Sequence, residues 1–273
     1  MILSKLNIFL PAFLIFWLSG CSNPAPKEKS HESIKDQDTI QVKSEDPNHF
    51  EVDSTGFPIN ILTTGMFHND EIWNNAGSMK WIGLFKGADG YYLRNTKVTS
   101  VPVHDPVLDE NESIMTGWEV STSGKDTSIL LMQALPYLAQ RKITAVKLSK
   151  TEIYPGEKVS FNYLGIEYEL FATGDKEKEN PDSDWYIVSN YKLYLSAKID
   201  GKRIKTLLTS HKMFDDAMVN LIFAGDIDGD GMLDLILDNT YHYNMTDPTL
   251  YFSRPAGKTQ AVKKVGSLAS VGC

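Results

Sequence analysis

The chain has 273 residues, a formal net charge of −8 and two cysteines. An acidic protein repels phosphate backbones and anionic head groups, so the composition argues against a nucleic-acid-binding protein. Cys21 lies near the N-terminus and Cys273 is the last residue, which argues against a fold held together by disulfides within the chain.

Residues 1–20 have the features of a bacterial secretory signal peptide. Lys5 provides the positive charge, and residues 6–18 form an apolar run shorter than the roughly 20 residues of a membrane span. The run ends in Leu18-Ser19-Gly20-Cys21, which resembles the lipobox of bacterial lipoproteins. The resemblance implies that Cys21 becomes the first mature residue and carries acyl chains. The alternative is an ordinary signal peptide whose cleavage leaves a cysteine.

The residues after Cys21 predict where the protein is held. In enteric lipoproteins an Asp after the cysteine marks retention in the inner membrane, whereas this chain has Ser22. The resemblance therefore implies a lipid-anchored protein of the cell envelope, in the outer membrane and facing the periplasm. Residues 21–55 are rich in Pro, Ser, Lys, Glu and Asp, and such a composition buries too little apolar surface to fold. We expect a lipidated cysteine followed by a flexible tether.

Residues 56–273 are predicted to form a mainly β domain, with antiparallel sheets and hairpins and minor helix. Runs rich in aromatic and branched apolar residues predict strands at 59–64, 81–85, 91–93, 97–103, 159–163, 168–171, 186–194 and 249–252. Turn residues predict hairpin turns within 85–91, 163–166 and 198–202, the last with an Asp-Gly pair. Residues 169–184 include a polar insert that fits a long exposed hairpin loop better than a lobe boundary.

Two segments are candidates for helix. Residues 128–140 have apolar spacing that fits a helix, which Pro136 would break or kink. Residues 68–76 fit either a short helix or a loop. Because these are the few helical candidates, we expect helix to be the minor component of the fold.

A regular series of acidic residues lies near the C-terminus, as Asp226-x-Asp228-x-Asp230-Gly231-x-x-Asp234. Calcium takes about six to eight oxygen ligands, which alternating aspartates on a tight loop supply. We expect one carboxylate oxygen each from Asp226, Asp228 and Asp230, and the backbone carbonyl of Met232. Asp234 closes the shell directly or through water. The alternative is an empty acidic turn held by Asx hydrogen bonds.

The residues around this series distinguish between two known types of calcium-binding loop. The start matches an EF-hand, but position twelve is Leu237 instead of Glu, and the flanks have the character of strands. Residues 225–237, GDIDGDGMLDLIL, resemble the calcium loop of FG-GAP repeats in integrin-type propellers. By that resemblance Asp226, Asp228, Asp230 and Asp234 are calcium ligands in a hairpin. A propeller repeats this motif in each blade, whereas this chain has it once.

No familiar catalytic motif is present, because the sequence lacks G-x-S-x-G, H-E-x-x-H, a P-loop and G-x-G-x-x-G. His242 lies near the calcium loop, but no nucleophile or second histidine has motif spacing to it. An acidic run around Pro106 fits an exposed loop better than a catalytic acid/base pair; it comprises Asp105, Asp109, Glu110 and Glu112. The sequence leaves open whether the protein is an enzyme.

Two functions remain in view. The first is a lipid-anchored binding or scaffold module with a structural calcium ion, attached to the membrane through Cys21 and recognising an unknown protein or glycan. The rest of the chain resembles uncharacterised bacterial lipoproteins, which implies no activity. The second is an envelope hydrolase acting on glycans or phosphoesters, which a deep cleft lined by Trp73, Trp81 and acidic residues would favour.

Overall fold

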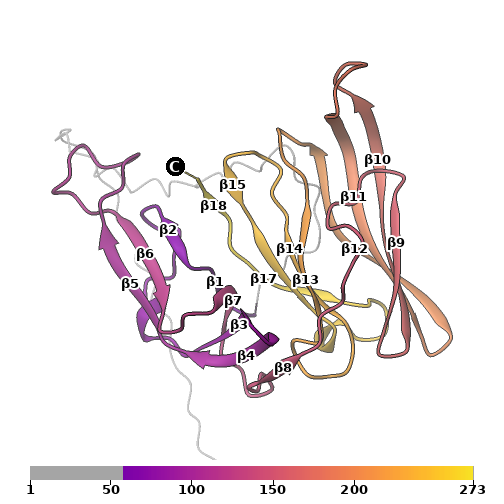
Figure 1. Cartoon of the computed structure of the whole chain (residues 1–273), viewed down its shortest axis with the longest axis horizontal. Helices are drawn as coiled ribbons and strands as arrows, with labels where there is room; N and C mark the ends of the chain where they lie inside the picture. Colours follow the sequence, from indigo (N-terminus) through magenta and orange to yellow (C-terminus); the bar gives the residue numbers. More distant parts are fainter. Residues whose placement is uncertain (1–57, 273) are drawn as a thin grey trace, which may run out of the picture. The chain divides into compact units, whose positions relative to one another are not determined.

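The computed structural model describes residues 58–272, which form antiparallel sheets (Figure 1). Helix within this range is confined to two single-turn 3-10 segments, η1 (Ala76–Ser78) and η2 (Arg254–Ala256). The expected mainly β fold with minor helix is therefore confirmed. In this part of the chain no helix has the length and apolar character needed to span a membrane. The predicted signal peptide, Cys21, the tether at 21–55 and Cys273 lie outside the described residues.

A five-stranded sheet and a three-stranded sheet are built from the first half of the described chain. The five-stranded sheet has the order β1 (Ile61–Leu62), β7 (Thr127–Gln133), β3 (Trp81–Gly87), β4 (Gly90–Thr96), β8 (Arg141–Ile143). The three-stranded sheet has the order β2 (Gly65–Phe67), β6 (Gly117–Thr122), β5 (Val98–Val103). The hairpin turn predicted within 85–91 is present, and the strand pairing extends to Gly87 and Gly90.

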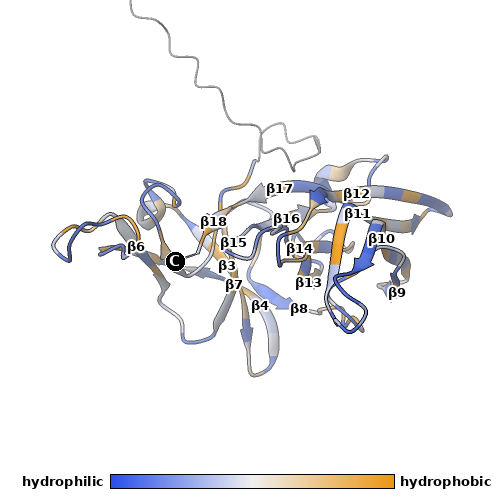
Figure 2. Cartoon of the chain, turned by 90° about the horizontal axis from the view of Figure 1, so that it is seen from above, coloured by the Kyte–Doolittle hydropathy of each residue, from blue (hydrophilic) through white to orange (hydrophobic). Residues whose placement is uncertain are grey.

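A four-stranded sheet of long hairpins follows, with the order β12 (Lys202–Met213), β11 (Tyr186–Ile199), β10 (Ile166–Lys178), β9 (Lys158–Tyr163). Its two tight turns are the predicted ones. Leu164 and Asp200 each have φ of +49° and are each followed by a glycine with positive φ, as two-residue hairpin turns with the twist of their strands demand. The predicted polar insert is a hairpin, but residues 173–178 continue β10, so the hydrophilic loop covers only 179–185 (Figure 2).

The sheet that carries the acidic loop has the order β13 (Asn220–Gly225), β14 (Asp234–Asp238), β16 (Pro248–Phe252), β17 (Lys263–Ser267). It lies between the five-stranded and four-stranded sheets (Figure 1). A separate two-stranded sheet pairs β15 (Met245–Thr246), which precedes β16 in the chain, with β18 (Ser270–Val271), which follows β17.

The two central strands of this middle sheet, β14 and β16, are buried on both faces. In β14, Ile236 belongs to the hydrophobic core of the five-stranded sheet, whereas Leu235 and Leu237 belong to the core of the four-stranded sheet. In β16, Leu250 and Tyr251 divide in the same way. Successive side chains of a strand point to opposite faces, so a strand covered on both faces has an unbroken apolar sequence. The runs on either side of the acidic loop are apolar for this reason.

The predicted helix at 128–140 is wrong. Residues 127–133 form β7, which pairs with β1 on one side and β3 on the other, and the chain then turns before β8. Leu130, Leu131 and Met132 are all completely buried, so the strand has no exposed face. A short run without alternation does not distinguish a buried strand from a buried helix. A short helix and a loop were the two alternatives for residues 68–76. Residues 68–75 form turns, so the loop is the correct one.

Candidate metal centre

The acidic series forms the connection between β13 and β14, at the end of the middle sheet. Gly225 pairs with Asp234 at the base of this connection, and Gly229 and Gly231 turn the chain with φ of +79° and +83°. Residues with a side chain resist that conformation, which accounts for the glycines in the motif. The loop is thus fixed to two neighbouring strands, of which β14 is buried on both faces.

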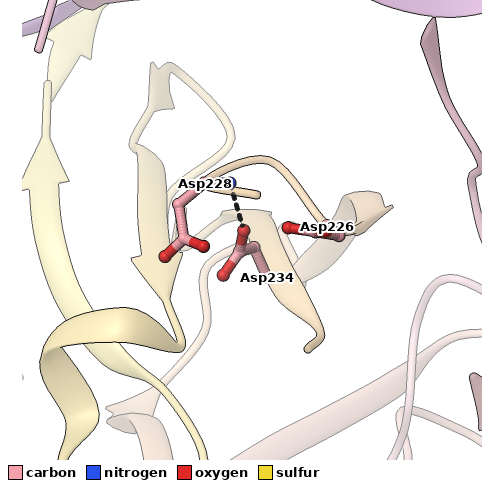
Figure 3. Close-up of side chains that lie close together, drawn as sticks. All are labelled: Asp226, Asp228 and Asp234. Carbon is pink, nitrogen blue, oxygen red and sulfur yellow. Dashed lines mark hydrogen bonds between the residues drawn. The ribbon is translucent and has the colours of Figure 1, made fainter. Parts of the chain in front are cut away.

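Three of the four predicted carboxylate ligands converge. Asp226, Asp228 and Asp234 each offer an oxygen, and these oxygens lie within 4.8 Å of one another (Figure 3). Calcium–oxygen distances are roughly 2.3–2.6 Å, so ligands on opposite sides of one ion lie about 5 Å apart. The spread of the three oxygens therefore fits a single calcium ion. Oxygen-only donors of this kind suit calcium better than zinc or copper.

Asp234 is the residue that fixes the loop. Its side chain is completely buried. Its Oδ2 accepts the backbone N–H groups of Ile227 at 2.6 Å and Asp228 at 2.8 Å. Its Oδ1 accepts the backbone N–H and the hydroxyl of Ser253, at 2.7 and 3.0 Å. Four hydrogen bonds use the acceptor directions of the carboxylate. Asp234 therefore holds the loop in shape even when no ion is bound.

The other aspartates brace the turn itself. Asp226 accepts the N–H groups of Gly229 and Gly231 at 2.6 and 3.1 Å. Asp228 Oδ1 accepts the N–H of Asp230 at 3.2 Å. Hydrogen bonds of this type would also hold an empty acidic turn, so they fit both alternatives given by the sequence.

Asp230 and Met232 stand apart from the three converging carboxylates. Asp230 Oδ1 accepts the N–H of Met232 at 2.8 Å and the hydroxyl of Ser253 at 2.9 Å. Met232 thus contacts the loop through its N–H. A ligand role for the Asp230 carboxylate, and another for the Met232 carbonyl, remain predictions.

Burial raises the free energy of the ionised carboxylates at this site. It raises the pKa of the Asp228 carboxyl to about 6, and the nearby charge of Asp230 acts in the same direction. Burial likewise raises the pKa of Asp234 well above its usual range, with the charge of Asp228 adding to the effect. A bound cation favours the ionised carboxylates and removes this cost.

Two arginines that the sequence did not reveal flank the carboxylates. Arg141 Nη2 lies 3.8 Å from Asp226 Oδ1 and donates to the carbonyl of Ile227 at 2.6 Å. Arg254 Nε lies 3.9 Å from Asp228 Oδ1, and its backbone N–H donates to Asp228 Oδ2 at 3.1 Å. The two guanidinium groups therefore place positive charge beside Asp226 and Asp228.

Two tyrosine hydroxyls from the β9–β10 hairpin hold the ends of the loop. Tyr163 accepts the N–H of Asp226 at 2.9 Å, and Tyr168 accepts the N–H of Leu233 at 3.3 Å. They lie 63 and 65 residues from their partners in the sequence. Because strand pairing alone brings them together, no local sequence signal identifies them.

A second group of charged residues lies in the loop between β5 and β6. His68 Nδ1 lies 2.6 Å from Asp105 Oδ2, and this hydrogen bond raises the pKa of His68. The prediction of an exposed acidic run is wrong for Asp105 and Asp109, whose side chains are 1% exposed. They are buried because they accept backbone N–H groups that shape the loop, as Asp105 Oδ1 does from Val107 at 2.9 Å. Glu110 and Glu112 are exposed, as expected.

The remaining candidate residues lie apart. His242 Nε2 pairs with Asp215 Oδ2 at 3.1 Å near the surface. Trp81 is 1% exposed and donates its indole N–H to the Ala76 carbonyl at 2.7 Å, so it is a core residue and lines no cleft. A cleft lined by both Trp73 and Trp81 would have favoured the hydrolase hypothesis, and the burial of Trp81 means that the described residues form no such cleft.

No family model, curated protein or solved structure matches this chain. The resemblance of residues 225–237 to an FG-GAP calcium loop therefore rests on those residues and on the geometry described above.

Proposed function

We propose that this chain is a lipid-anchored protein of the bacterial cell envelope, in which one calcium ion stabilises a β-rich binding or scaffold module. The convergence of Asp226, Asp228 and Asp234 within 4.8 Å carries this proposal. Its anchoring part is supported by the apolar run and lipobox-like residues that end at Cys21. The partner is an unknown protein or glycan.

In this proposal calcium has a structural role. The loop contacts three of the sheets: Arg141 belongs to β8, the two tyrosines to β9 and β10, and the loop itself connects β13 to β14. An ion that neutralises the buried carboxylates would strengthen the point where these sheets meet. Since the unfolded chain lacks the site, calcium shifts the equilibrium toward the folded protein by mass action.

Thermal unfolding in calcium, in magnesium and in chelator tests this function. With ligands from a single loop we expect a dissociation constant on the order of 10⁻⁴–10⁻³ M or somewhat tighter. At about 100 times that constant, calcium adds roughly 2.7 kcal/mol to the free energy of unfolding. Magnesium substitutes poorly, because it demands a smaller octahedral shell and releases its waters reluctantly.

Asp228→Ala should abolish the calcium dependence, because it removes one of the three converging carboxylates. Asp184→Ala is the matched control, since Asp184 is an exposed aspartate in the loop between β10 and β11. Equal melting temperatures for the parent in all three solutions would remove calcium from the proposal.

A further inference from the structure

A pocket of about 320 Å³ lies beside the three-stranded sheet, away from the acidic loop. The turn between β2 and η1 forms one wall, with Asn69, Asp70 and Asn74. Residues of β5 and β6 form the other, with Ser100 and Trp118. Binding pockets for small molecules have volumes of about 300–1,000 Å³, so this one has room for one or two sugar-sized rings.

Two tryptophans give the pocket an aromatic lining whose rings are held in place. Trp73 donates its indole N–H to the carbonyl of Ile61 at 2.8 Å, and Trp118 donates its own to the carbonyl of Asn69 at 2.8 Å. Both rings are partly buried and pack on the core of the five-stranded sheet. Because their only polar atoms are already bonded, the tryptophans offer a ligand apolar ring surface.

The polar groups of the pocket are uncommitted. Asn69, Asp70 and Asn74 are exposed, and none of their side chains bonds to another residue in the range 58–272. Two amides and one carboxylate supply both donors and acceptors. The hydroxyl of Ser100 lines the same space.

This combination selects a class of ligand. A pyranose ring has apolar C–H faces that pack on an aromatic ring and a rim of hydroxyls that both donate and accept hydrogen bonds. Among residues 58–272, no lysine, arginine or histidine lines the pocket and Asp70 is the one charged residue that does, so phosphate, sulfate and carboxylate ligands are disfavoured. A purely apolar ligand would leave the amides and the carboxylate desolvated without partners.

We propose that this pocket binds a neutral pyranose unit of a glycan. The proposal rests on the binding module proposed above and names its ligand class, but it uses none of the calcium-site residues. The wall that carries Asn69 is already ordered: the Glu71 N–H donates to the His68 carbonyl at 2.9 Å, and the Glu71 carboxylate accepts the His68 N–H at 2.8 Å. A pocket formed in advance loses little entropy on binding.

Titration with neutral oligosaccharides tests the proposal. We would add cellotriose, maltotriose, mannotriose or triacetylchitotriose, to about 10 mM for millimolar binding, to the full chain labelled with ¹⁵N at its tryptophans. We expect at least one sugar to shift the indole signals of Trp73 and Trp118. Trp81, which is 1% exposed in the core, and Trp185, which is 70% exposed near the β10–β11 loop, serve as internal controls whose signals stay in place. Trp→Phe variants assign these four signals and distinguish them from the fifth, that of Trp17.

The double variant Asp70→Ala, Asn74→Ala should weaken binding about tenfold, because it removes two hydrogen-bonding side chains. Asn75→Ala is the matched control, since Asn75 is exposed and adjacent but does not line the pocket. If none of the four sugars moves the two signals, or if the double variant binds as the parent does, the proposal is wrong.

Repeating the titration on Asp228→Ala separates the two proposals. Sugar binding that survives in that variant supports the pocket, even if calcium fails to stabilise the parent. Calcium stabilisation without any sugar response overturns the pocket alone.

Discussion

The Ser253 hydroxyl donates a hydrogen bond to Asp234 Oδ1 at 3.0 Å, and the Ser253 backbone N–H donates to the same oxygen at 2.7 Å. The two residues are 19 positions apart in the chain. Their contact ties the start of β14 to the segment that follows β16, so the acidic loop is closed by a residue outside its motif. The same hydroxyl reaches Asp230 Oδ1 at 2.9 Å.

Ser253→Ala should lower the free energy of unfolding by about 1–3 kcal/mol, because Asp234 Oδ1 and Asp230 Oδ1 each lose one of their two donors and keep only a backbone N–H. Denaturant unfolding measures this difference. Ser149→Ala, at an exposed serine, is the control and should unfold at the parent midpoint. If the two variants unfold at the same midpoint, the hydroxyl does not stabilise the loop.

Asp238→Ala distinguishes a structural aspartate from a metal ligand. Asp238 Oδ1 accepts the N–H groups of Thr240 and Asp247 at 3.2 and 2.8 Å, beyond the loop. We expect this variant to lose about 1–3 kcal/mol equally in calcium and in chelator, because two backbone donors lose their acceptor. Asp228→Ala should instead remove the difference between the two solutions. An Asp238→Ala variant that no longer responds to calcium would contradict this assignment of roles.

The raised pKa of Asp228 gives the protein a specific pH dependence in chelator. The folded-state pKa is about 6, above the ordinary value of 3.8, so between these values the folded state binds more protons than the unfolded chain. This contribution to stability is present below pH 3.8 and is lost as the pH rises through about 6. Its size is about 3 kcal/mol at most.

Calcium should reverse that dependence. Protons compete with the ion for Asp228, so the affinity for calcium falls as the pH drops below about 6. The difference in melting temperature between calcium and chelator should therefore increase as the pH rises from 5 to about 7.5. If the difference in melting temperature is the same at every pH in this range, Asp228 does not bind the ion.

Membrane attachment is tested by labelling cells with an alkynyl fatty acid. The chain has two cysteines, which provide a matched pair of variants. Cys21→Ser should abolish labelling and leave unprocessed precursor, whereas Cys273→Ser should be labelled like the parent. Labelling that persists in Cys21→Ser would remove the lipoprotein proposal.

Features with local causes were predictable from the sequence. The turn at Asp200-Gly201 depends on two residues that accept positive φ, and the acidic loop is visible because its aspartates alternate over nine residues. Features with distant causes were not. Arg141 reaches the Ile227 carbonyl across 86 positions, and only the pairing of strands brings it there.

Burial produced the other errors of prediction. Residues 130–132 looked helical because both faces of β7 are covered, which removes the alternation that identifies a strand. Asp105 was expected to be exposed because of its charge. It is buried because His68 and two backbone N–H groups, of Val107 and Leu108, satisfy its carboxylate.

The most direct test of the calcium site is isothermal titration of the full chain with calcium, starting from protein freed of metal by chelator. The geometry of Asp226, Asp228 and Asp234 predicts one ion per chain, with a dissociation constant on the order of 10⁻⁴–10⁻³ M or somewhat tighter. The Asp228→Ala variant should give no saturable heat. A parent protein that takes up no calcium at about 10 mM, well above that constant, would contradict the calcium site.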